Sequence, residues 1–171
     1  MILDVNIRRH GVEVLQRRLS ECLNAELEGY RVYSLSKRYD NMNLWAKYAG
    51  NHSGYCLEFA NNGFFFSCAK EVVYCKSVQL DLNDPDLNGY WFFYKSEEWS
   101  NEEEVRVVVR RGGDSKAQIS PTVLTRLILG WKMSEEDRDV VRTWAKHRNP
   151  ELKVVSAYFD PLDQQLKLTS P

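Results

Sequence analysis

The sequence predicts an α+β fold, in which about seven short strands form a mostly antiparallel sheet with about three helices. Short runs rich in Val, Ile, Tyr and Phe have the length of strands, and longer segments repeat their apolar residues at helical spacing. Strands and helices do not alternate along the chain, as they would in a parallel sheet. The 171 residues contain no repeat or linker and are enough for one sizeable core. We therefore expect a single domain over residues 1–171.

The first part of that domain is predicted to be helical. Leucines recur at helical spacing over residues 11–28, and Gly29 follows them as a stop signal. We therefore expect residues 1–29 to form an N-terminal helical segment in front of a core over residues 30–171.

The elements of the core follow from local patterns. A short helix is expected from Asp40 or Asn41, either of which can cap it, to Ala49, and a longer one from Ser134 to His147. The side chains of the longer helix predicted to face the core are Val140, Val141, Trp144 and Ala145. Strands are predicted at Arg31–Ser36, Tyr55–Phe59, Phe64–Ser67, Glu71–Tyr74, 103–110, Leu124–Leu129, Leu152–Tyr158 and Gln165–Leu168, with loops at Leu80–Gly89 and Arg111–Ser115.

The charge balance argues against nucleic-acid and membrane partners. Lys and Arg total 23 and Asp and Glu total 24, so no overall field attracts nucleic acid or anionic lipid. Nucleic-acid binding through Arg8, Arg9, Arg17 and Arg18 is the weakest hypothesis, since solvated arginines explain these residues as well. No apolar run approaches the ~20 residues that a membrane-spanning helix needs.

The cysteines predict neither a metal site nor a disulfide framework. The four cysteines form no C-x-x-C pair, and no histidine cluster completes the spacing of zinc ligands. Free thiols are typical of a reducing cytoplasm, and the first residues lack the apolar core of a signal peptide. We expect a cytoplasmic protein with no metal and no covalently bound cofactor.

The stretch EEWSNEEEVRVVVRR contains the strongest candidate for a site. On a strand, Glu102, Glu104 and Arg106 would share one face, opposite a row of valines. One carboxylate could stabilise a developing positive charge while the other positions or deprotonates a nucleophile. Trp99, just before them, could exclude water or stack on a ring. The alternative is a solvated strand face with ion pairs, which the E-x-E spacing alone favours.

Other candidates are polar or aromatic side chains near that stretch. Ser34 and Ser36 share a strand face and could bond ribose or phosphate oxygens, although serines on the solvent side of an edge strand look the same. Tyr48 could form part of a binding platform, although core packing explains it too. His52, in the turn NHSG, could donate to an anion or simply lie on the surface.

Several linked motifs resemble the domain-of-unknown-function 2971 family of bacteria and their phages. They are V-x-S-L-S (Val32–Ser36), N-x-x-L-W-x-x-Y-A (Asn41–Ala49), H-x-G-x-C-L-E-F (His52–Phe59), K-x-x-x-W-x-x-E-x-E-x-R (Lys95–Arg106) and I-L-G (Ile128–Gly130). Members of this family usually begin with a further strand and helix, so by comparison the chain looks short at its N-terminus. The family implies no settled activity.

A more remote similarity is to ADP-ribosyltransferases, which carry an S-x-S strand before a late E-x-E. In that scheme Ser34 and Ser36 match the S-x-S. Glu104 would hold the nicotinamide ribose of NAD and support an oxocarbenium-like transition state, and Glu102 would orient the acceptor. The residue that grips NAD on the first strand of that superfamily has no counterpart here, so the similarity is one of fold.

Two functions remain in view. The first is an NAD-binding, ADP-ribosyl-transferring enzyme with Glu104 and Glu102 as catalytic residues and Ser34, Ser36, Tyr48, His52, Trp99 and Arg106 as binding residues. The alternative is an interaction or sensor module with a protein partner, in phage defence or counter-defence. In that alternative, Glu102, Glu104 and Arg106 would form a structural ion-pair network with Lys95, and Trp45 and Trp99 would be core.

Overall fold

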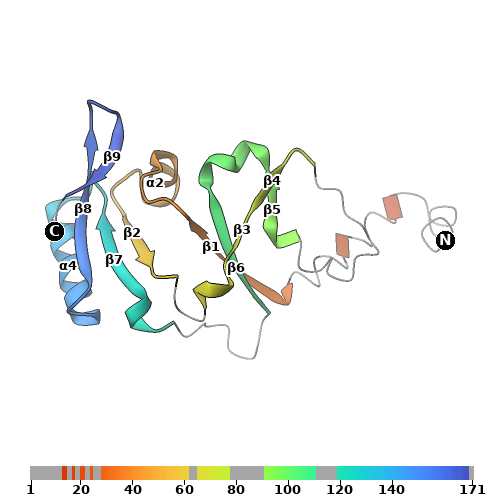
Figure 1. Ribbon diagram of the computed structural model, residues 1–171, viewed down its shortest axis with the longest axis horizontal. Coiled ribbons are helices and arrows are strands. Elements are labelled where there is room, and N and C mark those ends of the chain that lie inside the picture. The colour runs from red at the N-terminus through yellow and green to blue at the C-terminus, as the bar shows by residue number, and fades with distance from the viewer. Residues whose placement is uncertain are drawn as a thin grey trace.

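The computed structural model describes residues 28–61, 65–77, 91–110 and 119–169, together with six single positions between Glu13 and Asn24 (Figure 1). Those six positions are helical, in agreement with the helix predicted there. The rest of residues 1–27, the predicted loops at Leu80–Gly89 and Arg111–Ser115, and Phe64 of a predicted strand lie outside the described residues.

The described strands form three sheets, and most neighbouring strands run antiparallel. The parallel pairs among them are β4–β5 and β7–β8. This arrangement confirms the predicted α+β class. The first sheet has the strand order β1 (Tyr30–Ser36), β6 (Glu104–Arg110), β3 (Lys70–Glu71). The second sheet has the order β2 (Tyr55–Phe59), β7 (Leu124–Leu129), β8 (Lys153–Asp160), β9 (Gln165–Leu168). The third sheet consists of β4 (Val73–Cys75) and β5 (Tyr94–Ser96).

The helices begin at the predicted caps. Asn41 caps α2 (Met42–Tyr48), because its side-chain oxygen accepts from the backbone N–H groups of Asn43 and Leu44. Ser134 caps α4 (Glu135–Arg148) by accepting from Asp137 N at 3.1 Å. The short 3₁₀ helices are η1 (Phe66–Cys68), η2 (Trp91–Phe93), η3 (Glu97–Glu102) and η4 (Pro121–Val123).

Strand β7 lies at the centre of the core and is covered on both faces. Ile128 packs in a cluster with Trp45 of α2, whereas Leu127 and Leu129 pack in a second cluster with Ala145 of α4. All three β7 residues are fully buried, which explains why this strand reads as a continuous apolar run. The core thus fixes α2 and α4 on opposite faces of the second sheet (Figure 1).

Two details of the prediction are wrong. Phe66 and Ser67, predicted in a strand, lie in η1, where the tight turn places the Phe66 ring in a third cluster with Val107 of β6. On α4, Val140 and Trp144 are exposed, while Val141 and Ala145 face the core. Val141 and Ala145 are four residues apart and share the helix face that packs on the sheet. Val140 and Trp144 form the neighbouring row, which is turned away from the sheet.

No helix in the described part of the chain is long and apolar enough to cross a membrane.

Candidate functional site

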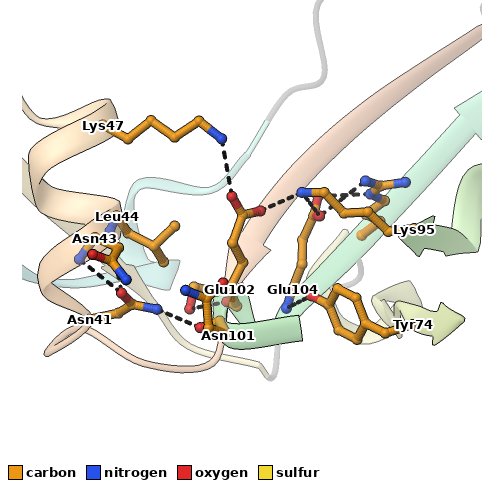
Figure 2. Close-up of polar contacts among 11 residues, drawn as sticks. Asn41, Asn43, Leu44, Lys47, Tyr74, Lys95, Asn101, Glu102 and Glu104 are labelled. Atoms are coloured by element: carbon orange, nitrogen blue, oxygen red, sulfur yellow. Dashed lines mark hydrogen bonds and ion pairs between the residues drawn. The ribbon is translucent and has the colours of Figure 1, made fainter. Parts of the chain in front are cut away.

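The two candidate glutamates lie on either side of a sharp change in the backbone. Glu97–Glu102 form η3, Glu103 adopts a left-handed conformation with φ 44° and ψ 51°, and β6 begins at Glu104. The prediction that Glu102 and Glu104 share a strand face is therefore wrong, because Glu102 precedes the strand. The turn nevertheless returns the side chain of Glu102 to the neighbourhood of Glu104 (Figure 2).

A shared lysine brings the two carboxylates together. Lys95 Nζ, from β5, donates to Glu102 Oε2 and to Glu104 Oε2, the latter at 3.0 Å. Lys47 Nζ, from α2, lies 3.3 Å from the other oxygen of Glu102 (Figure 2). Both glutamates are only 7% exposed. The result is an ion-pair network around two buried carboxylates, to which β5, β6, α2 and η3 each contribute a side chain.

Arg106 completes the network from the next position on the same face of β6. Its guanidinium binds Glu104 through two nitrogens, with Nε 2.7 Å from Oε1 and Nη2 3.0 Å from Oε2. The remaining Nη1 donates to the carbonyl of Phe92 at 2.6 Å. A two-point contact of this kind fixes the carboxylate in orientation as well as in position. We refer to Lys47, Lys95, Glu102, Glu104 and Arg106 as the ion-pair network.

This environment keeps Glu104 ionised. Burial by itself would raise the pKa of Glu104, but hydrogen bonds from Arg106, Ser34 and Lys95 favour the charged form and lower the pKa to about 2. For Lys95, burial acts to lower the pKa, and the hydrogen bonds to Glu102 and Glu104 outweigh it and raise the pKa. A permanently ionised carboxylate can bind or stabilise a cation, but it is a weak base at neutral pH.

The serines of β1 bind the backbone and side chains of the same glutamates. Ser34 pairs with Arg106 across the β1–β6 ladder, and its hydroxyl is hydrogen-bonded to Glu104. Ser36 Oγ donates to the carbonyl of Glu102 at 2.9 Å. From β4, Tyr74 accepts the backbone N–H of Glu104 at 2.8 Å (Figure 2).

A cavity of about 710 Å³ opens beside the ion-pair network. Its walls come from β1, α2 and β2, and its polar end from Lys95, Glu102, Glu104 and Arg106. Aromatic rings of Tyr33, Tyr39, Trp45, Tyr48, Tyr55 and Phe59 line the remainder. Pockets of a few hundred Å³ with apolar walls and a few converging polar groups are the usual sites for small ligands.

The other predicted site residues lie at different distances from this cavity. Tyr48 lies at its edge and is 66% exposed. Trp99 is not part of the wall but lies under Lys47, whose Nζ is 3.9 Å from the centre of the indole ring. Trp99 is also 40% exposed, so it is not the core residue of the alternative hypothesis, whereas Trp45 is buried.

His52 lies away from the cavity, at the turn after α2. Its side chain is buried against Trp131, and its Nδ1 has no hydrogen-bond partner among the described residues. Burial lowers the pKa of His52, and the charge of Lys132 lowers it further. A neutral, buried imidazole at this position supports the turn and does not reach the ligand-sized cavity.

Sequence reasoning did not find Lys47 or Arg38 as parts of the site. Arg38 lines the cavity and forms ion pairs with Asp40 and Glu103. Lys47 shares its helix with Tyr48, and only the packing of α2 beside η3 reveals its role. Within the described ranges, no group of three or more His, Cys, Asp or Glu side chains is arranged to hold a metal ion.

Comparison with known proteins gives one match. Residues 44–107 match the family described as "Protein of unknown function (DUF2971)". This segment is therefore similar to the DUF2971 family. The match confirms the resemblance predicted from the sequence, and it includes every member of the ion-pair network. Ser34 and Ser36 lie before the DUF2971 segment, on the strand that packs against its last residues.

No curated protein and no solved structure matches the chain.

Proposed function

We propose that this chain binds a nucleotide-sized ligand in the cavity beside the ion-pair network, and that NAD is the first ligand to test. The observation that carries the proposal is the buried Glu104 carboxylate, held by the partly buried Lys95 and Arg106, at one end of a 710 Å³ cavity with aromatic walls. Buried charges are costly, and a chain that places them beside a ligand-sized cavity has a ready-made polar end for a ligand.

The charges that line the cavity favour an anionic ligand. Arg38, Lys95 and Arg106 line it as cations and Glu102 and Glu104 as anions, so these five side chains together carry one net positive charge. Phosphate groups would therefore be attracted to the cavity. Serine hydroxyls on β1 could bond ribose oxygens in the same place.

The aromatic walls suit the flat rings of a dinucleotide. Tyr48 and Tyr55 are half or more exposed at the edge of the cavity, so a ring that stacks on them would lose little of the protein's own packing. A base or nicotinamide ring at the aromatic end and phosphates at the basic end would use both features.

ADP-ribosyl transfer is a second candidate function of the same site. In this reaction the bond between ribose C1′ and nicotinamide breaks, nicotinamide takes the electron pair, and an acceptor nucleophile then bonds to C1′ and loses its proton. The observation in its favour is that Glu104 is fixed in place and ionised, with a pKa of about 2, as a group that stabilises positive charge on the ribose must be. Binding is the better supported function, because both oxygens of Glu104 already accept hydrogen bonds from cations.

Thermal melting of the full chain with NAD, ADP-ribose, ATP and nicotinamide tests the proposal. A ligand at about 100 times its dissociation constant stabilises the folded state by about 2.7 kcal/mol, which raises the melting temperature measurably. We expect Tyr48→Ala to weaken the shift, and the matched variant Tyr158→Ala to keep it. Tyr158 is exposed to a similar degree, at 43%, but lies on β8 outside the cavity.

The outcomes separate the functions. A shift with NAD or ADP-ribose that Tyr48→Ala reduces supports the ligand site, and release of nicotinamide on incubation with NAD would add transfer chemistry. No shift with any of these ligands would overturn the proposal and leave the ion-pair network as the structural group of an interaction module.

A further inference from the structure

Two strand edges face each other across an open slot. β1 and β2 are the terminal strands of their sheets. The 710 Å³ cavity lies on the Ser34 and Arg106 face of the first sheet, and a second cavity of about 410 Å³ lies on the opposite face, beside Val105. Both cavities are lined by the same parts of β1 and β2, among them Leu35, Ser36, Cys56, Leu57 and Phe59. We call the space that they share the β1–β2 slot.

The backbone groups of β1 that point into the slot can be assigned from the hydrogen bonds of β6. Lys37 N donates to Glu103 O at 3.1 Å, so this pair is hydrogen-bonded. Glu104, the next residue, instead accepts from Val72 N on its other side at 3.0 Å. In an antiparallel pair the direction alternates along the strand. The N–H and C=O groups of Ser36, Ser34 and Val32 therefore point away from β6.

The same reasoning applies to β2. Gly130 N donates to Gly54 O at 2.9 Å, so this pair is hydrogen-bonded, and the backbone groups of Tyr55 and Leu57 point away from β7. Among the described residues, no backbone group is hydrogen-bonded to the outward groups of Val32, Ser34, Ser36, Tyr55 or Leu57, and the Leu57 carbonyl has only a weak contact with Cys56 Sγ at 3.9 Å. Such rows of donors and acceptors are templates for a further strand.

We propose that the β1–β2 slot binds an extended peptide segment of a partner protein, which adds as a strand to the free edge of β1. The outward groups of Val32, Ser34 and Ser36 would bond its backbone, as in other cases of strand addition. β2 forms the far side of the slot, and Tyr33 and Phe59 approach each other across it, with 6.4 Å between their ring centres. This inference goes beyond the ligand site and does not depend on it.

The residues that line the two faces of the slot determine which side chains the peptide should carry. Alternate side chains of an added strand would point to opposite faces of the first sheet. On one face the slot is lined by Arg38, Lys95, Arg106, Glu102 and Glu104, which carry one net positive charge. On the other face it is lined by Leu35, Phe59, Phe66 and Val105, together with two cations (Lys37 and Arg38) and two anions (Glu58 and Glu71) whose charges cancel. The matching peptide alternates acidic and apolar residues.

The direct test is amide hydrogen exchange of the full chain with the peptide acetyl-Val-Glu-Val-Glu-Val-Glu-Val-amide. We expect the amides of Val32, Ser34 and Ser36 to exchange at least about tenfold more slowly when the peptide is bound. The same peptide with alternate backbone nitrogens methylated, so that it loses the donors facing β1, should give no protection. A peptide with Lys in place of Glu should bind more weakly.

A pair of variants tests the same contact from the protein side. Val32→Pro removes one outward N–H, and proline is tolerated in an edge strand where that group faces outward. Val32→Ala keeps the N–H and is the matched control, because the Val32 side chain is 42% exposed and is not part of the ion-pair network. We expect the proline variant to weaken binding at least about tenfold and the alanine variant to bind like the wild type. If the proline variant does not fold, the methylated peptide still decides the question.

Four results would overturn the proposal. The first is equal binding of the methylated peptide, and the second is protection confined to amides outside β1. The third is protection of the three β1 amides in the free monomer, which would show that the chain covers its own edge. The fourth is concentration-dependent protection without peptide, which would identify a second copy as the occupant. None of these results depends on NAD, so this proposal and the ligand site can fail separately.

Discussion

Lys95 and Glu104 are joined by an ion pair of 3.0 Å, and the same ammonium group also binds Glu102. Two buried carboxylates this close would repel each other if no cation lay between them. The shared lysine, with Arg106 and Lys47 around it, compensates both negative charges. Lys95 therefore links the two candidate catalytic residues.

Loss of this lysine should destabilise the protein. We expect Lys95→Met to lower the free energy of unfolding by about 3 kcal/mol, because it leaves two buried carboxylates with less compensation. Lys37→Met is the control, since the pair of Lys37 with Glu71 is exposed and should contribute less than about 1 kcal/mol. Urea unfolding measures both, and equal losses would contradict the importance of the shared lysine.

The stability of the protein should depend on the charge of Glu104 at acidic pH. The pKa of Glu104 is about 2 in the folded state, below its ordinary value of 4.5, so the unfolded chain binds this proton more readily. The stabilisation is complete above the unfolded pKa and is lost as the pH falls from there toward 2. Between pH 6 and pH 3, the wild type should lose about 2 kcal/mol relative to Glu104→Gln. Urea unfolding at several pH values tests this, and parallel pH profiles for the two proteins would refute it.

His52 should make the protein less stable when the pH falls below neutrality. Its pKa is lowered from 6.5 in the folded state, so the unfolded chain takes up the proton first and stability decreases as the pH passes down through 6.5. His52→Asn should remove this decrease, and asparagine tolerates the positive φ of 71° at this position. An NMR titration of the His52 ring in the folded protein measures the pKa directly, and a midpoint at or above 6.5 would contradict the expectation.

Gly130 should not tolerate a side chain. A Cβ atom there would meet the carbonyl oxygen of His52 and lie 2.7 Å from that of Gly54, and neither backbone group can move freely. We expect Gly130→Ala to cost about 3 kcal/mol or more. Gly50→Asn is the control, because its Cβ would meet the movable hydroxyl of Ser53 and asparagine accepts the positive φ. Similar thermal midpoints for the two variants would show that the contact at Gly130 relaxes.

Local patterns were enough to predict most strands and both capped helices. β1, β2, β7 and α2 lie within a residue or two of their expected bounds, because alternation and capping act within a few neighbouring residues. The outward side of α4 was harder to predict. Val140 and Trp144 have the same hydrophobic character as the buried Val141, and only the position of the sheet determines which of them is covered.

The candidate site was predicted in part. The E-x-E-x-R motif placed Glu104 and Arg106 correctly on one face of β6, because period two is a property of the strand itself. The place of Glu102 was wrong, since the left-handed Glu103 ends η3 one residue before β6 begins. Lys47 joins the network through tertiary packing alone, and no spacing in the sequence indicates it. The roles assigned to Ser34, Ser36, Tyr48, His52, Trp99 and Arg106 remain predictions.

The attachment of α2 gives the cavity one firm wall and one yielding wall. Toward the second sheet, the turn that follows α2 is held by backbone hydrogen bonds, from Gly130 N to Gly54 O and from Lys132 N to His52 O. Toward η3, the described contacts of α2 and its cap are side-chain contacts, in which Asn41 binds Asn101 O and Lys47 binds Glu102. Salt screens the ion pair of Lys47 with Glu102 and leaves the neutral backbone hydrogen bonds almost unchanged. A bulky guest would therefore widen the cavity on the η3 side, and more easily in concentrated salt than in dilute buffer.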